Sequence, residues 1–203
     1  MKGSSFVATT DSMRGEAYRD RVSKILFSEE DIHRRVGELA EAIVYDYSEG
    51  GAAKDVKGRP LLLVCILRGA LIFSADLARR MSIPLEYDLI CVSSYRNKTA
   101  PGAVRLIQDL EVPIVGRDVL IVEDIIDTGH TATYLIRSLL ARKPASIRIC
   151  TLIDKVSRRQ VATEVDYAGF DLTEDEFIVG YGMDYAELYR NLPFIGVLKP
   201  EYI

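Results

Sequence analysis

Short, uniformly hydrophobic runs alternate along this chain with longer segments in which apolar residues recur at helical spacing. Two such runs, at 61–67 and 119–122, have the length of strands, and the segment 146–153, although it includes polar residues, is also expected to form a buried strand. Because polar residues do not alternate within the first two, these are typical of strands buried on both faces in a parallel sheet. Helical patterns follow at 70–80 and 127–140. This order predicts an α/β fold with a mostly parallel sheet.

The first part of the chain divides into a tail and a helix. Residues 1–22 are polar and show no sustained periodicity, so we expect a flexible tail. Ser28, with Asp31 three residues later, resembles a capping box. The helix that it begins should continue to the glycine pair at Gly50.

Weaker patterns complete the expected layout. Residues 85–95 alternate as a strand with unequal faces, and 104–107 can return beside it as the second strand of a hairpin. Residues 164–173 are expected to form a connector, with Tyr167 and Phe170 in the core. Two further short strands are expected, at 177–179 and 193–198.

Composition narrows the class of protein. At 203 residues, with 48% hydrophobic and 28% charged residues, the chain fits one soluble globular domain. Its net charge of −4 argues against nucleic acid as the main partner. No apolar run is long enough for a signal peptide or a membrane span, so we expect a cytoplasmic protein without membrane contact. The cysteines lie in apolar runs and are expected to be buried thiols: Cys65, Cys91 and Cys150.

Residues 119–131 concentrate the candidate chemistry. Glu123 and Asp124 directly follow an apolar run, and residues 127–131, Asp-Thr-Gly-His-Thr, open a helical pattern. The first N–H groups of a helix are unpaired and favour an anion, which small residues allow to approach. Adjacent carboxylates favour a cation or hydroxyl donors, and ribose with Mg²⁺ supplies both. The stretch therefore indicates a ribose phosphate site. The alternative is structural: Asp127 or Thr128 simply caps the helix.

Residues 123–129, Glu-Asp-Ile-Ile-Asp-Thr-Gly after four apolar residues, resemble the phosphoribosyl-pyrophosphate signature of the type I phosphoribosyltransferases. The residues of this motif are most similar to those of the 6-oxopurine branch, the hypoxanthine-guanine phosphoribosyltransferases of bacterial type. The resemblance extends from about residue 25 to residue 198 through further matches in order: Leu67-Arg68-Gly69, Ser94-Tyr95, Asp154-Lys155, and 177–185 with Arg190.

The resemblance implies a doubly wound, mostly parallel sheet flanked by helices, with a small hood contributed by the chain ends. It implies one domain over 23–203 that includes this base-binding hood. The implied activity is purine salvage: Mg²⁺-dependent transfer of 5-phosphoribosyl from phosphoribosyl pyrophosphate to N9 of hypoxanthine or guanine, giving IMP or GMP. A homodimer or homotetramer is also expected on this ground, as is a cis peptide bond between Leu67 and Arg68.

The resemblance also assigns roles to single residues. Asp127 is the catalytic residue, accepting the purine N7 proton. Its partners in holding the ribose and its phosphate are Glu123, Asp124, Thr128, Gly129, His130 and Thr131. The pyrophosphate residues are Arg68, Gly69 and Arg190, and the mobile loop begins with Ser94 and Tyr95. The purine residues are Lys155, Phe177, Ile178 and Asp184, and the metal ligands are Glu123, Asp124 and Asp184.

Simpler interpretations accompany these roles. Lys155 and Arg190 could be ordinary surface residues, and Phe177 could be a core residue. We expect the His130 ring to face solvent near the phosphate. At the level of function, the alternatives are a xanthine-preferring transferase and a non-catalytic phosphoribosyl-fold regulator that binds a nucleotide or RNA. The acidic balance speaks against the second.

Overall fold

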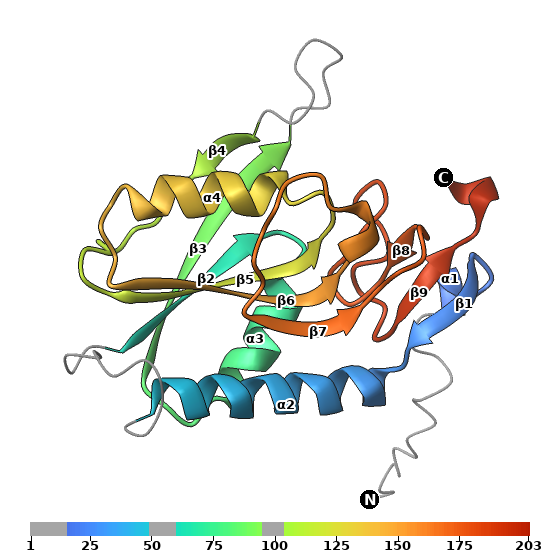
Figure 1. The fold of residues 1–203 in the computed structure, drawn as a ribbon. Coiled ribbons are helices and arrows are strands. Elements are labelled where there is room, and N and C mark those ends of the chain that lie inside the picture. The colour runs from blue at the N-terminus through green and yellow to red at the C-terminus, as the bar shows by residue number, and fades with distance from the viewer. Residues whose placement is uncertain (1–15, 49–59, 95–103) are drawn as a thin grey trace, which may run out of the picture.

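The computed structural model describes residues 16–48, 60–94 and 104–203, and its main feature is a six-stranded sheet (Figure 1). The strand order is β4-β3-β2-β5-β6-β7. All neighbouring pairs are parallel except β3 with β4, which form the expected hairpin. The strands are β2 (Leu61–Leu67), β3 (Leu85–Ser94), β4 (Val104–Gln108), β5 (Asp118–Ile126), β6 (Ser146–Asp154) and β7 (Tyr167–Asp171).

Helices cover both faces of this sheet, so the doubly wound α/β architecture is confirmed. α2 (Glu29–Tyr47) and α3 (Leu71–Arg80) lie on one face, and α4 (His130–Leu140) lies on the other (Figure 1). Two hydrophobic core clusters lie against this sheet. From β2, the side chains of Leu61, Leu63 and Cys65 pack into one of them, and those of Leu62 and Val64 pack into the other. Burial on both faces explains why these runs contain no polar alternation.

A second, three-stranded sheet forms the hood, in the order β1-β9-β8. It joins β1 (Val22–Phe27) from the start of the described chain to β8 (Ile178–Val179) and β9 (Ile195–Leu198) near its end. Figure 1 shows it beside the end of the large sheet, with its own small cluster of buried residues. The remaining short elements are α1 (Glu16–Arg19) and the 3₁₀ turns η1 (Val156–Arg158) and η2 (Pro200–Tyr202).

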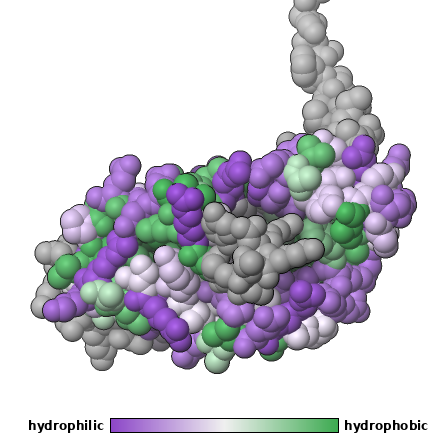
Figure 2. Space-filling view, turned by 90° about the horizontal axis from the view of Figure 1, so that it is seen from above, coloured by the Kyte–Doolittle hydropathy of each residue, from purple (hydrophilic) through white to green (hydrophobic). Residues whose placement is uncertain are grey.

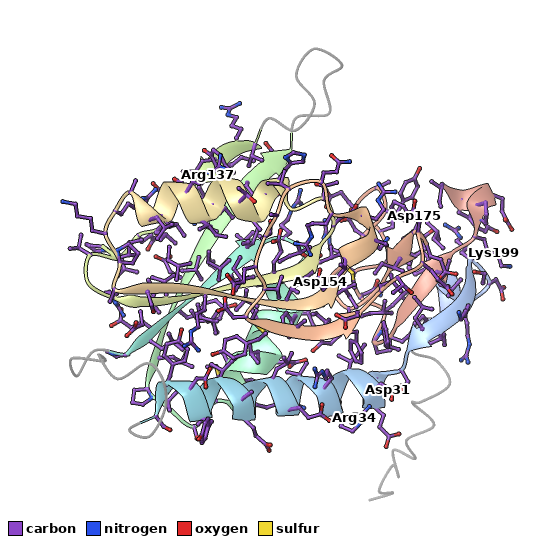
Figure 3. All side chains as sticks on the ribbon, in the orientation of Figure 1. Asp31, Arg34, Arg137, Asp154, Asp175 and Lys199 are labelled. Carbon is purple, nitrogen blue, oxygen red and sulfur yellow. The ribbon has the colours of Figure 1, made fainter. Side chains whose placement is uncertain are left out.

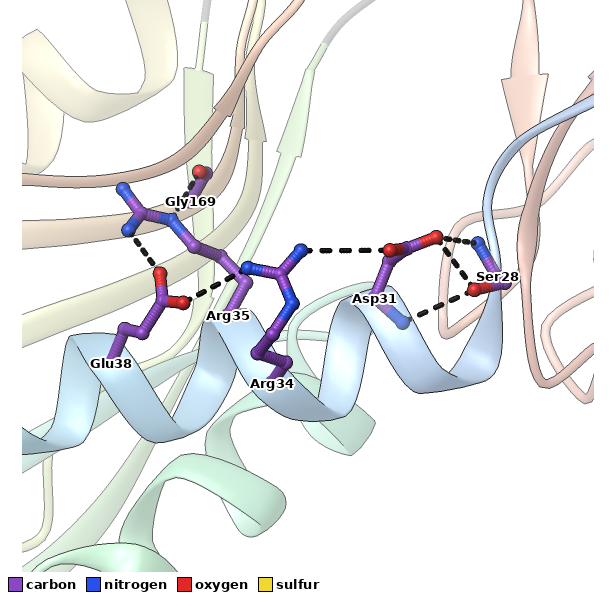
Figure 4. Close-up of polar contacts among 6 residues, drawn as sticks. All are labelled: Ser28, Asp31, Arg34, Arg35, Glu38 and Gly169. Atoms are coloured by element: carbon purple, nitrogen blue, oxygen red, sulfur yellow. Dashed lines mark hydrogen bonds and ion pairs between the residues drawn. The ribbon is translucent and has the colours of Figure 1, made fainter.

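The predicted capping box begins α2, as Figure 4 shows. The Ser28 hydroxyl accepts from the Asp31 amide at 3.1 Å, and the Asp31 carboxylate accepts from the Ser28 amide at 3.2 Å. Arg35 then ties the helix to β7 by donating through Nε to the Gly169 carbonyl at 2.6 Å. The cap and this contact fix the helix along the edge of the large sheet.

Four expectations need correction. Residues 16–22 are not a tail, because they form α1 and the start of β1; residues 1–15 lie outside the described residues. Residues 167–171 are a strand rather than a connector, with parallel pairing to β6. β5 continues through Glu123 and Asp124 to Ile126, so these carboxylates lie within the strand. Cys65 and Cys150 are buried free thiols, but Cys91 is only half-buried.

The outer surface agrees with the composition. The face shown in Figure 2 carries mostly hydrophilic residues, with scattered hydrophobic ones between them. Among the described helices, none has the length and apolar character needed to cross a membrane. The Leu67–Arg68 peptide bond is cis, as expected.

Candidate functional site

The carboxyl ends of β2, β5 and β6 lie side by side at one edge of the large sheet. Parallel pairing sets Cys65 of β2 opposite Val122, and Ile126 of β5 opposite Asp154 of β6. Open α/β sheets bind ligands at this edge. The three connections that leave it carry Arg68-Gly69, Asp127 to Thr131, and Lys155.

The turn before α4 presents free backbone donors. Gly129 is the N-cap residue, in the left-handed region at φ 85°, and no side chain caps the helix. The alternative that Asp127 or Thr128 caps α4 is therefore wrong. Within the described residues, no group accepts a hydrogen bond from the amides of 128–132. Such a row of unpaired amides at the positive end of a helix is suited to a phosphate.

A second loop holds this turn in place. The amides of Gln160 and Val161 both donate to the Thr128 carbonyl, at 3.0 and 3.1 Å. A Cβ atom on Gly129 would lie 2.6 Å from Thr163 Oγ1 and 2.7 Å from the Val161 carbonyl oxygen. Position 129 therefore requires glycine for space as well as for its φ.

We expected the His130 ring to face solvent, and the ring is indeed partly exposed, but it also has a side-chain contact. It is half-buried and lies 3.2 Å, through Nε2, from Oε1 of Gln160. This side-chain contact joins the start of α4 to the loop that holds the turn. A contribution of His130 to an anion site therefore comes from its backbone amide.

Two adjacent carboxyl groups lie beside the turn in an unfavourable environment. Burial raises the pKa of Glu123 to about 8, and the neighbouring Asp124 adds to this effect. Burial likewise raises the pKa of Asp124 to about 6, although its contacts with backbone amides and Arg190 oppose the shift. Buried acids of this kind are stabilised by a cation or by hydroxyl donors. The pair can thus hold a polyol, a metal ion or both.

Gly69 lies between two walls of the site. A Cβ atom there would lie 2.0 Å from Oδ2 of Asp124, and a Cβ atom on Gly182 would lie 2.1 Å from the Gly69 carbonyl oxygen. The backbone of the loop after β2 is therefore in contact with the Asp124 carboxylate of β5 on one side. On the other side it is in contact with the backbone of the turn after β8.

Charged side chains gather over this loop. Arg190 donates to the Gly182 carbonyl at 2.8 Å and pairs with Asp184 at 2.7 Å. Glu187 accepts from Arg190 at 3.2 Å and from Arg68 at 3.0 Å, which places one carboxylate between both arginines. The predicted residues Arg68, Arg190 and Asp184 are thus brought together, and Glu187 was missed. Glu187 has φ 67° without being glycine, so no residue type in the sequence marks this turn.

On the hood side of the site, neither simpler interpretation holds: Lys155 is not a surface residue, and Phe177 is not a core residue. Lys155 is buried at 6% exposure rather than lying on the surface, and burial lowers its pKa. Its Nζ donates to the Glu176 carbonyl at 2.6 Å. Phe177 is 39% exposed, so it is not a core residue, and its ring meets the edge of Tyr185 at a centroid distance of 5.4 Å. Ile178 is buried and pairs with Val197.

Asp127 has a partner that the sequence did not indicate. Nε of Arg158 lies 3.2 Å from Oδ1 of Asp127, and Nη1 of the same guanidinium contacts both oxygens of Asp175 at 2.8 and 2.7 Å. Figure 3 shows Asp175 on the hood side, and Asp154 at the end of β6. Of the expected mobile loop, Ser94 ends β3 and Tyr95 lies outside the described residues.

Comparison with known proteins gives a consistent result. A model of the phosphoribosyl transferase domain matches residues 28–186. The chain is 43% identical over 194 residues to a hypoxanthine-guanine phosphoribosyltransferase of Mycobacterium bovis, covering 95% of this chain and 94% of that one. It is 46% identical over 180 residues to the Bacillus subtilis protein of the same name, covering 88% and 94%. A solved hypoxanthine phosphoribosyltransferase from Staphylococcus aureus superposes with a TM-score of 0.83 at 42% identity, covering 92% of this chain and 96% of that one.

Proposed function

This chain belongs to the phosphoribosyl transferase family, and we propose that it transfers the 5-phosphoribosyl group of phosphoribosyl pyrophosphate to N9 of hypoxanthine or guanine. The relatives named hypoxanthine-guanine phosphoribosyltransferase match most of the chain. The observation that carries the proposal is the meeting, at one sheet edge, of an open phosphate turn, the adjacent carboxyl groups of Glu123 and Asp124, and a buried lysine. Each fits one part of the two substrates.

The donor substrate would occupy the β5–α4 connection. The amides of 128–131 would bind its 5′-phosphate, and Glu123 and Asp124 would accept hydrogen bonds from the ribose hydroxyls. Because the carbohydrate hydroxyls are hydrogen-bond donors, they would favour the ionised forms of Glu123 and Asp124, which burial disfavours. The ribose would then lie with its anomeric carbon toward the pyrophosphate loop and the hood.

Mg²⁺, which the family implies, fits this set of donors. Glu123 and Asp124 have raised pKa values because burial leaves their negative charge uncompensated. The described residues contain no cluster of three or more side chains suited to hold a metal, and Mg²⁺ commonly binds one or two carboxylates and completes its shell with substrate oxygens and water. We propose Glu123 and Asp124 as the protein ligands of one Mg²⁺, and Asp184 as the ligand of a second. When bound, Mg²⁺ would supply positive charge that stabilises the leaving pyrophosphate.

The protein itself also stabilises the leaving group. As the bond from the anomeric carbon breaks, positive charge develops on the ribose and negative charge on the pyrophosphate. Arg190, with its planar set of donors, and Arg68 would hold the pyrophosphate oxygens after Glu187 gives way. The backbone of Gly69 would lie against the same group.

The acceptor base would bind between the sheet edge and the hood. Phe177 would stack on the purine, Ile178 would present backbone groups to its edge, and Lys155 would donate to the oxygen at position 6. A buried donor at that point selects oxo over amino bases, because an amino group would leave it unpaired. Asp127 would accept the proton from N7 as N9 attacks.

A direct assay tests the proposal. With phosphoribosyl pyrophosphate and Mg²⁺, we expect turnover with hypoxanthine and guanine but not with adenine or uracil; xanthine measures the breadth of the pocket. Asp127→Asn should lower kcat roughly 10²- to 10⁴-fold, since that is the usual contribution of a general base. The KM for phosphoribosyl pyrophosphate should change little. Equal turnover in the variant would remove Asp127 from this role.

A further inference from the structure

We propose that Arg158 is a positioning residue, which fixes the carboxylate of Asp127 relative to the purine-binding segment by bridging it to Asp175. The proposal rests on the function proposed above, in which Asp127 accepts the purine proton. No feature of the sequence marks Arg158, because the bridge depends on three side chains from separate segments.

The bridge uses one guanidinium group for two carboxylates. Nε faces Asp127 at 3.2 Å, while Nη1 faces the two oxygens of Asp175 at 2.8 and 2.7 Å. Because the guanidinium is planar and rigid, these contacts orient the two acids relative to one another. Asp175 immediately precedes Glu176 and Phe177, so the bridge ends at the segment proposed to bind the base.

The backbone around Arg158 is held on both sides. The Lys155 amide donates to the Ile126 carbonyl at 3.0 Å, and the Lys155 ammonium donates to the Glu176 carbonyl at 2.6 Å. Arg158 follows in η1, where its own amide donates to the Lys155 carbonyl at 3.1 Å. Lys155 therefore anchors the same two segments through its backbone and ammonium that Arg158 joins through its side chain.

The exposure of these groups argues for orientation rather than stability. The side chains of Arg158, Asp127 and Asp175 are 40%, 42% and 65% exposed. Ion pairs this exposed contribute little to the free energy of folding. A general base, in contrast, depends steeply on its position, because a displacement of about 1 Å can cost roughly 100-fold in rate. Loss of the bridge should therefore reduce turnover much more than it reduces stability.

The first experiment replaces Arg158 and measures steady-state kinetics. Arg158→Met should lower kcat roughly 10- to 100-fold, with the KM for phosphoribosyl pyrophosphate within about twofold of wild type. Arg158→Lys, which keeps the charge but loses the fork, should restore only part of kcat. The matched control is Arg142→Met, because Arg142 makes a similar two-bond pair with Asp109 at 2.8 and 2.9 Å away from the site. It should leave both kinetic constants unchanged, and all variants should melt within a few degrees of wild type.

The second experiment tests the bridge as a unit. Asp175→Asn should lower kcat in the same direction, and the double variant Arg158→Met/Asp175→Asn should be no slower than Arg158→Met alone. Multiplying losses, or an Arg158→Met variant with the kcat of wild type, would overturn the proposal. These outcomes are distinct from failure of the proposed function, which would appear as a wild-type protein without turnover or an Asp127→Asn variant without loss.

Discussion

Glu123 has a carboxyl group whose pKa departs far from its ordinary value in solution. Its carboxyl group is 8% exposed, and burial beside Asp124 raises its pKa to about 8. In the unfolded chain it should ionise near the ordinary value of 4.5. The folded protein without ligands therefore binds a proton at Glu123 over a pH range in which the unfolded chain does not.

This difference predicts how stability depends on pH. The contribution of Glu123 is fully present below its unfolded pKa and is lost as pH rises toward about 8, because the folded state binds more protons throughout this window. Each pKa unit of difference between the folded and unfolded states corresponds to about 1.4 kcal/mol in the free energy of unfolding. Between about pH 5 and about pH 8, the melting temperature of the wild type should fall more than that of Glu123→Gln. Parallel curves for the two proteins would contradict the expectation.

Glu187 leads to a prediction about donor binding. Its carboxylate lies between Arg68 and Arg190, so it would have to be displaced for these arginines to bind pyrophosphate oxygens as proposed. Removing its charge by Glu187→Gln should lower the KM for phosphoribosyl pyrophosphate, by up to about fivefold for an exposed pair. Inhibition by pyrophosphate should strengthen in parallel. Glu201→Gln, on η2, is the control; a rise in KM would mean that Glu187 instead holds the arginines in place.

At the scale of single residues, the sequence identifies contiguous motifs but not the side-chain contacts between residues that are far apart along the chain. Asp127 and Lys155 could be placed because each follows a recognisable strand. The pairs Arg158–Asp127 and Arg68–Glu187 could not, since 31 and 119 residues separate their members along the chain. Glu187 also depends on left-handed backbone at Ala186, Glu187 and Tyr189, none of which is glycine. Such contacts arise only once the backbone path is known.

At the scale of elements, Gly129 decides how β5 passes into α4. The substitution Gly129→Ala would add a Cβ atom 2.7 Å from the Val161 carbonyl oxygen in a backbone conformation at φ 85°. We expect it to displace the turn and raise the KM for phosphoribosyl pyrophosphate at least 10-fold, since a shift of about 1 Å in a binding turn can cost this much. Gly116→Ala is the matched control, because Gly116 has φ 66° with open space around it. It should lose only the roughly 1 kcal/mol that left-handed backbone costs, seen as a lower melting temperature with unchanged kinetics.

Strands buried on both faces and the β3–β4 hairpin were predictable, whereas β7, at the other edge of the sheet, was not. β2 and the first half of β5 lie between two layers of helices, and their uniform hydrophobicity follows from that position. β7 lies at the end of the sheet and includes Gly169, where a Cβ atom would lie 2.4 Å from the Leu152 carbonyl oxygen. Close packing against β6 therefore selects a small residue that sequence patterns associate with loops. The same segment was mistaken for a connector.

At the scale of the whole molecule, the hood has a small core cluster of its own, although Ile178 and Ile195 also pack into a core cluster of the large sheet. The hood cluster comprises five buried residues, Val179, Tyr189, Leu192, Phe194 and Leu198, whereas two larger clusters cover the faces of the large sheet. Regions with fewer buried contacts open at lower free energy. We expect amides in β8 and β9 to exchange hydrogen faster than those in β2 and β5. Adding IMP should slow exchange in the hood more than in β2; uniform exchange across both sheets would indicate one cooperative unit.

The contact around Gly69 sets a limit on how this scaffold can diversify. Asp124, the Gly69 peptide and the backbone of Gly182 are stacked without room for a methyl group. The distance between Asp124, proposed to hold the sugar, and the loop at Gly69, proposed to hold the leaving group, is therefore set by direct contact between atoms. A donor with a longer linkage between sugar and diphosphate would not match it. We therefore expect proteins with this fold to differ in the acceptor base that they use, because side chains rather than backbone atoms determine the size of the proposed base-binding site.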